Sequence, residues 1–138
     1  MVEIKAVYEG GLRCVATHGP SGAVLPTDAP KDNMGKGEAF SPTDLVATAM
    51  GTCMLTTMGI VAQRNNIDMA GAQVRVTKEM GSQPTRRIGK IGVEIVMPRA
   101  MSEEDQRRLE SAALHCPVHK SLHPDVQIPV TFKWGDGE

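Results

Sequence analysis

Three cysteines, Cys14, Cys53 and Cys116, are the side chains of this chain best suited to chemistry, because a cysteine thiolate is a strong nucleophile. Their number is odd, and residues 1–5 do not start a charged segment followed by an apolar run, the pattern of an export signal. We therefore expect a cytoplasmic protein without a framework of structural disulfides. Its thiols would then be available for redox chemistry.

Cys116 lies where one helix is expected to end and a short helical turn to begin. The segment 103–115 carries an acidic start after Ser102 and the spacing of a helix with one apolar side. Pro117 suits the first position of a new turn, so Cys116 would be its N-cap, where free backbone N–H groups favour a thiolate. Three basic side chains lie close to it in the sequence: His115, His119 and Lys120. Cys116 is therefore a candidate reactive thiol.

The other two cysteines give weaker signals by themselves. Cys53 lies among Met50, Met54 and other apolar residues, and such surroundings raise the pKa of a thiol and leave it unreactive. Cys14 lies between Arg13 and Val15 on a predicted strand, which indicates a structural thiol.

The pattern Cys-x-x-His at residues 116–119 also occurs in metal sites. A zinc site of this type needs a second pair of ligands, and neither Cys14 nor Cys53 has a partner at ligand spacing. The sequence has no glycine-rich phosphate loop, Gly-x-Ser-x-Gly motif or dinucleotide fingerprint. We therefore expect no metal and no cofactor.

A long helix over residues 41–65 places Cys53 near its middle. Ser41 and Asp44 form an acidic capping box, and Pro42 suits the first helical position. No charged residue occurs from 45 to 62, and the apolar residues cover more than one face of the helix. Four threonines and two glycines interrupt this run, so we do not expect a membrane span. One small sheet cannot cover such a helix, so we expect a second subunit to do so.

The remaining segments alternate as strands do. Strands are expected at 2–8, 12–17, 23–25, 72–80, around 91–98 and 126–134, with a loop at 26–39 and a second helix at 103–115. Pro129 indicates that the last strand is an edge or bulged strand. The pattern predicts one α+β domain over residues 1–138 with mostly antiparallel sheet. Fifteen basic and sixteen acidic residues give no reason to expect nucleic acid or an anionic membrane as a partner.

Two motifs then resemble a known family. Residues 40–45 and Ala-Thr-Ala-Met-Gly-Thr-Cys53 on the long helix, followed by residues 113–122 around Cys116, are similar to the OsmC/Ohr family of thiol-dependent hydroperoxide reductases. The resemblance covers nearly the whole chain. It implies an OsmC-like fold in which antiparallel sheets from two subunits wrap around the long central helices of an intertwined homodimer.

The resemblance also implies a reaction and its residues. Cys53 would be the peroxidatic cysteine that attacks an organic hydroperoxide and becomes a sulfenic acid, and Cys116 the resolving cysteine that forms a disulfide with it. An external dithiol would reduce that disulfide. The expected role is a peroxidase in oxidative stress defence, with peroxiredoxin-like chemistry.

The chain departs from the best-studied members at the group that supports the thiolate. Thr43 stands where the family has a glutamate that holds an arginine, and the nearest acid is Asp44. Arg13 is the candidate arginine, and Glu38 could pair with it, although both could also be ordinary surface charges. The alternative function is therefore an OsmC-like dimer without efficient peroxidase activity that binds a small hydrophobic molecule. A disulfide exchange protein ranks lower, because the chain has no Cys-x-x-Cys motif.

Overall fold

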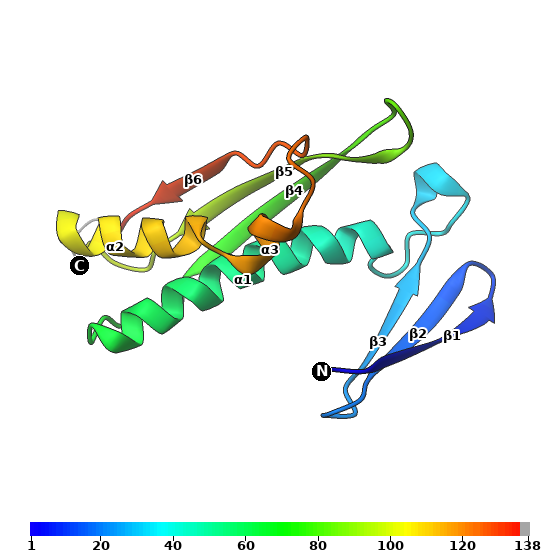
Figure 1. Cartoon of the computed structure of the whole chain (residues 1–138), viewed down its shortest axis with the longest axis horizontal. Helices are drawn as coiled ribbons and strands as arrows, with labels where there is room; N and C mark the ends of the chain where they lie inside the picture. Colours follow the sequence, from blue (N-terminus) through cyan, green and yellow to red (C-terminus); the bar gives the residue numbers. More distant parts are fainter. Residues whose placement is uncertain (136–138) are drawn as a thin grey trace. The chain divides into compact units, whose positions relative to one another are not determined.

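The computed structural model describes residues 1–135, and the chain divides into two compact units that meet in sequence between Val46 and Ala47. Each unit contains one three-stranded sheet. A long helix follows the first sheet in the sequence, and two shorter helices connect the last two strands of the second sheet (Figure 1). This arrangement confirms the α+β class. The assignment of residues 1–138 to one domain stays a prediction.

The first unit is a sheet in the order β1-β2-β3, formed by β1 (Ile4–Gly10), β2 (Arg13–His18) and β3 (Val24–Asp28). Both strand pairs are antiparallel. Gly10 and Gly11 have φ of 87° and 63°, so they make the tight turn between β1 and β2 that only glycine adopts without strain. β3 extends beyond the predicted 23–25 into the expected loop, which also contains the 3-10 turn η1 (Lys31–Asn33).

The long helix α1 (Pro42–Arg64) begins at the predicted capping box. The Asp44 N–H donates to Ser41 Oγ at 3.1 Å, and the Ser41 N–H donates to Asp44 Oδ2 at 2.9 Å. Two backbone donors that a helix start leaves free are thus satisfied by these two side chains. The sequence prediction of the helix start is confirmed.

The second unit contains a sheet in the order β4-β5-β6, formed by β4 (Gln73–Gly81), β5 (Arg87–Val96) and β6 (Val130–Lys133). β4 and β5 form the predicted antiparallel hairpin, whereas β6 runs parallel to β5, so the sheets are mostly antiparallel, as the sequence predicts. The connection between β5 and β6 passes through α2 (Glu103–Leu114) and α3 (Pro117–Ser121), which carries the chain back to the starting end of β5. Such a crossover permits a parallel pair. β6 is an edge strand, as Pro129 predicts.

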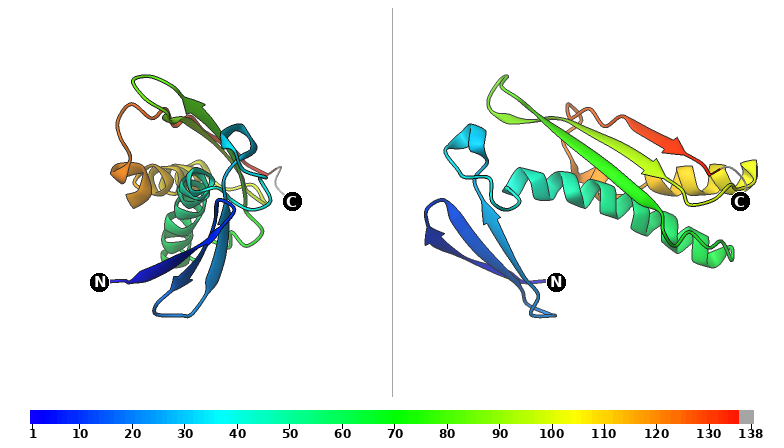
Figure 2. Two further views of the ribbon diagram at one scale, coloured as in Figure 1. Left: turned by 90° about the vertical axis from the view of Figure 1, so that its right-hand side faces the viewer. Right: turned by 180° about the vertical axis from the view of Figure 1, so that it is seen from behind.

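The core of the second unit lies between this sheet and the two longer helices. Figure 2 shows α1 and α2 on the same face of the sheet, where Ile91, Val93 and Ile95 of β5 are buried. α1 packs tightly against β4 at Gly51, where an added Cβ would lie 2.5 Å from Val76 Cγ2. Methionines contribute much of the buried volume, as their number in the sequence predicts.

α1 is buried on one face rather than all round. Its buried residues recur at helical spacing: Ala47, Met50, Gly51, Met54, Met58 and Ala62. By length and composition α1 could cross a membrane, as core helices of other proteins also could, and a third of its apolar window is buried. Ile60 on another face remains 46% exposed. The second subunit expected to cover that face stays a prediction.

Candidate active site

Cys53 and Cys116, which lie 63 positions apart in the sequence, are neighbours in the second unit. Cys53 lies on α1 and is half-buried, whereas Cys116 lies between α2 and α3 and is fully buried. Both are free thiols, and Cys53 is close enough to influence the pKa of Cys116. The structure therefore brings together the two cysteines that the sequence singles out, with one of them more open to solvent than the other.

Cys116 is the N-cap of α3, as the sequence predicts. Its backbone is extended, with φ of −63° and ψ of 133°, and Pro117 occupies the first turn of the helix. Its Sγ accepts a hydrogen bond from the His119 N–H at 3.4 Å. The local sequence around Cys116 thus fixes the position of its sulfur.

The pKa of Cys116 is raised, contrary to the expectation that the cap and the histidines would favour a thiolate. Burial is the largest cause, and the neighbouring Cys53 thiol also raises this pKa, because both favour the protonated thiol. The N–H groups of His119 and Val118 lower the pKa but do not outweigh these effects. His115 is exposed, and its Nδ1 lies 2.7 Å from the Ser111 carbonyl oxygen. The net effect of these surroundings is to favour the protonated thiol of Cys116.

The threonines beside Cys53 use their hydroxyl groups within α1. Thr52 Oγ1 donates to the Thr48 carbonyl oxygen at 2.9 Å, and Thr57 Oγ1 donates to the Met54 carbonyl oxygen at 3.0 Å. Met50 and Met54 on either side of Cys53 are fully buried. The surroundings of the Cys53 sulfur on its own helix are therefore largely apolar, as the sequence indicates.

The first unit contains an ionic cluster around Arg13. The Arg13 guanidinium lies 3.4 Å from Asp28 Oδ2 and forms a second ion pair with Glu38. Sequence analysis anticipates the contact with Glu38 but misses Asp28. The pairing register supplies the missing signal, because Asp28 on β3 stands directly opposite Arg13 on β2. Arg13 is thus held by two carboxylates within its own unit.

Asp28 is 1% exposed, which is unusual for a carboxylate. Its pKa is lowered, first by the hydrogen bond that Oδ2 accepts from the Glu38 N–H at 3.0 Å, with a further contribution from the Arg13 charge. Burial acts in the opposite direction but does not prevail. Within residues 1–135, Asp28 Oδ1 is buried without a hydrogen-bond partner. Asp28 therefore fixes both Arg13 and the segment that carries Glu38.

Asp44 is the acid nearest to the expected glutamate position, and it forms hydrogen bonds at the start of α1. Its carboxylate accepts the Ser41 N–H, and the Thr43 hydroxyl lies 3.2 Å from Ser41 Oγ. Thr43, at the position where the resemblance leads us to expect a glutamate, thus stands within a complete capping box. Within its unit, Arg13 has Asp28 and Glu38 as its acidic partners.

Cys14 lies on β2 and is half-buried. It lines a pocket of about 170 Å³ in the first unit, together with Glu9, Arg13 and Glu38. A second pocket in this unit, of about 230 Å³, is mainly apolar and is lined by residues such as Ile4, Ala16 and Leu25. Each of these two pockets has room for a small molecule.

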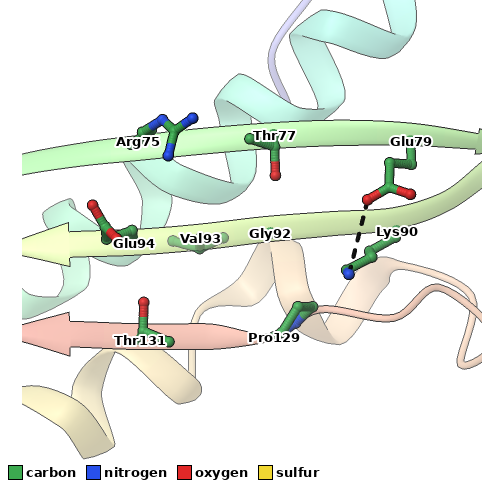
Figure 3. Close-up of a pocket in the computed structure, with 9 residues that line it drawn as sticks. All are labelled: Arg75, Thr77, Glu79, Lys90, Gly92, Val93, Glu94, Pro129 and Thr131. Atoms are coloured by element: carbon green, nitrogen blue, oxygen red, sulfur yellow. Dashed lines mark ion pairs between the residues drawn. The ribbon is translucent and has the colours of Figure 1, made fainter.

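A polar pocket of about 230 Å³ lies on the outer face of the β4-β5-β6 sheet (Figure 3). Its side chains point away from α1 and α2, and an ion pair of 3.8 Å joins Glu79 and Lys90 at one end. Gly92 forms its floor, where an added Cβ would lie 2.7 Å from Thr77 Oγ1. Charges of both signs line this pocket, so it does not suit a hydrophobic ligand.

In residues 1–135, no group of three or more His, Cys, Asp or Glu is placed to hold a metal ion.

Comparison with known proteins places this chain in a family. The family described as OsmC-like protein matches residues 35–131. The organic hydroperoxide resistance protein-like 2 of Staphylococcus epidermidis is 30% identical over 107 residues, which cover 74% of this chain and 75% of the relative.

Solved structures show the same fold. A Psychrobacter arcticus protein, described provisionally as an osmotic stress induced and detoxification response protein, is 45% identical, with a TM-score of 0.91 and 96% of each chain covered. The organic hydroperoxide resistance protein OhrB of Bacillus subtilis is 18% identical, with a TM-score of 0.72, covering 96% of this chain and 98% of its own. At that identity the second likeness concerns the fold alone.

Proposed function

Because the chain belongs to the family of OsmC-like proteins, we propose that it reduces organic hydroperoxides with Cys53 and Cys116 as its redox-active pair. The observation that carries this proposal is that the two free thiols are neighbours, one half-buried and the other fully buried. Family membership supports a redox role in general. The printed name of the Staphylococcus relative, which refers to organic hydroperoxides, supports the substrate class.

The proposed cycle has two chemical steps. The Cys53 thiolate attacks the distal oxygen of the hydroperoxide, the O–O bond breaks, and Cys53 becomes a sulfenic acid while an alcohol is released. Cys116 then attacks the sulfenic sulfur, which forms a disulfide and releases water. An external dithiol reduces the disulfide and restores both thiols. Half-buried Cys53 is the accessible member of the pair and fully buried Cys116 the inner one, which matches these two roles.

Three further features belong to the same proposal. The buried methionines beside Cys53 favour a hydrophobic peroxide over hydrogen peroxide. Arg13, fixed by Asp28 and Glu38, is the proposed cation that supports the Cys53 thiolate. The protein would act as a homodimer in the cytoplasm, in defence against oxidative stress.

Intact mass spectrometry tests the proposal directly. The reduced protein is measured before and after one equivalent of cumene hydroperoxide, alongside the Cys53→Ser and Cys116→Ser variants. We expect the loss of two hydrogens in the wild type, a trapped sulfenic acid in Cys116→Ser and no change in Cys53→Ser. An unchanged wild-type mass would contradict the proposal.

The alternative function is the binding of a small hydrophobic molecule without efficient peroxidase activity. The apolar pocket beside Ile4 and Leu25 is the observation that favours it. A wild-type protein that stays reduced in the mass experiment, but binds a hydrophobic fluorescent probe that a Leu25→Glu variant does not bind, would support this alternative.

A further inference from the structure

The polar pocket on the outer face of the β4-β5-β6 sheet is hollow because its middle position is a glycine. Thr77 on β4 stands directly opposite Gly92 on β5, and Pro129 lines the pocket on the other side of Gly92 (Figure 3). A Cβ at Gly92 would lie 2.7 Å from Thr77 Oγ1 and would fill part of this space. The glycine therefore keeps open a hollow of about 230 Å³ for a small molecule.

The charges around this hollow are paired with one exception. At one end Lys90 Nζ lies 3.8 Å from Glu79 Oε2, and beside the other end Lys133 Nζ lies 3.4 Å from Glu94 Oε2. Arg75 stands directly opposite Glu94 in the pairing of β4 with β5, but among residues 1–135 it forms no ion pair. Within the described chain, the Arg75 guanidinium is thus the uncompensated charge of the pocket.

An unpaired guanidinium favours an anion with two oxygen atoms in one plane. Its N–H groups form a planar fork, which matches a carboxylate through two parallel hydrogen bonds. The carboxylates of Glu79 and Glu94 line the same pocket, so they would repel a second negative charge on the ligand. The electrostatics of the pocket therefore suit a molecule with a single carboxylate.

The space beside Arg75 is lined by groups that form hydrogen bonds. In Figure 3 the hydroxyl groups of Thr77 and Thr131 point toward the middle strand β5 from either side. Each hydroxyl group both donates and accepts, so the pair suits a ligand that carries hydroxyl groups rather than an alkyl chain. Residues two positions apart on a strand are about 7 Å from each other, so a chain of several carbon atoms bound at Arg75 reaches Thr77.

We propose that this pocket binds a small polyhydroxy monocarboxylate. The carboxylate contacts Arg75, the hydroxyl groups contact Thr77 and Thr131, and the carbon chain lies over Gly92. A hollow of about 230 Å³ suits a free acid rather than a segment of another protein. The inference does not depend on the proposed peroxidase, because the side chains of this pocket point away from α1, the helix that carries Cys53.

Gluconate, a straight-chain monocarboxylate whose other carbon atoms all carry hydroxyl groups, is the probe. Its binding is followed by ¹H–¹⁵N NMR at constant ionic strength, through the amide shifts of Thr77, Gly92 and Thr131. Sorbitol, which lacks the carboxylate, and hexanoate, which lacks the hydroxyl groups, are the control ligands. Arg75→Gln and Thr77→Val remove the two kinds of contact. Arg107→Gln, which removes an exposed arginine of α2, is the charge-matched control.

We expect saturable shifts of the three amides with gluconate, and binding of sorbitol and hexanoate at least about tenfold weaker. Arg75→Gln should weaken gluconate binding about tenfold or more, because hydrogen bonds to a charged group are lost, and Thr77→Val about two- to tenfold. Arg107→Gln should leave the affinity unchanged. Shifts that do not saturate, equal affinity for hexanoate, or equal affinity in Arg75→Gln would overturn the inference. None of these outcomes bears on the peroxidase, which the mass experiment tests separately.

Discussion

The Arg13 guanidinium lies 3.4 Å from the carboxylate of Asp28, which is 1% exposed. Asp28 also accepts the Glu38 N–H, so one buried carboxylate joins β2 to the segment that leads to α1. A buried charge of this kind is stabilising only while its partners are in place, because an unpaired one retains its full desolvation cost. The first unit should therefore depend on the charge of Asp28.

The first prediction is that this unit loses stability in acid and that Asp28→Asn removes much of this dependence. The pKa of Asp28 is lower in the folded protein than its ordinary value of 3.8, so the folded state binds fewer protons than the unfolded state. Its contribution to stability is complete above the ordinary value and is lost as the pH falls through the lower, folded value. Urea unfolding between pH 2.5 and 6 measures this slope. Glu3→Gln, which changes an exposed carboxylate 3.9 Å from Lys5, is the control and should leave the slope unchanged.

Arg13 carries a second prediction, which depends on the proposed function. Replacing it with glutamine should slow the oxidation of Cys53 by cumene hydroperoxide at least about tenfold, because the thiolate loses its cation. Glu38→Gln should have a smaller effect, since Asp28 still holds the guanidinium. Single-turnover kinetics check this, and the free energy of unfolding of each variant controls for structural damage. An oxidation rate unchanged in Arg13→Gln would assign Arg13 and its carboxylates to the stability of the first unit.

Local sequence patterns predicted the helix starts well and the long-range pairings less well. Ser41 with Asp44, and Cys116 with Pro117, lie within a few residues of each other, so their capping geometry follows from the order of residue types. The parallel pairing of β6 with β5 depends on how a long connection returns, and no residue within β6 records that. Asp28 was missed because an isolated aspartate in a loop-like sequence gives no signal until β3 is placed opposite β2.

The difference between local patterns and long-range packing also explains why the pKa of Cys116 is raised. The sequence showed the N–H groups and the basic neighbours that favour a thiolate, and these are local features. Burial of the sulfur and its contact with Cys53 come from packing between α1 and the segment after α2, and they determine the direction of the pKa shift. Motifs thus identified both cysteines, whereas the protonation state required the fold.

Two glycines of α1 give a matched test of its packing. At Gly51 an added Cβ would lie 2.5 Å from Val76 Cγ2 and 3.2 Å from Val74 Cγ2, whereas no such neighbour lies within 4 Å of Gly59 among residues 1–135. Gly51→Ala should destabilise the protein by about 1–3 kcal/mol through overpacking. Gly59→Ala should stabilise it by roughly 0.5–1 kcal/mol, because alanine has the higher helix propensity. Urea denaturation measures both. A large loss in Gly59→Ala would contradict this reading and indicate that another surface, such as a second subunit, packs there.

The final prediction concerns the pKa of Cys116. Burial, the largest cause of its increase, remains when Cys53 is replaced by alanine, but the influence of the neighbouring Cys53 thiol is removed. The pKa of Cys116 should therefore fall relative to the wild type and still exceed the ordinary value of 9.0. Titration of ¹³C-labelled cysteine by NMR measures this, with Cys14→Ser as the background in both proteins. Alanine is preferred to serine at position 53, because a serine hydroxyl would itself hydrogen-bond to Cys116. A Cys116 pKa that is the same in both proteins would show that the two thiols do not interact in solution, and it would weaken the proposal that they act as a redox pair.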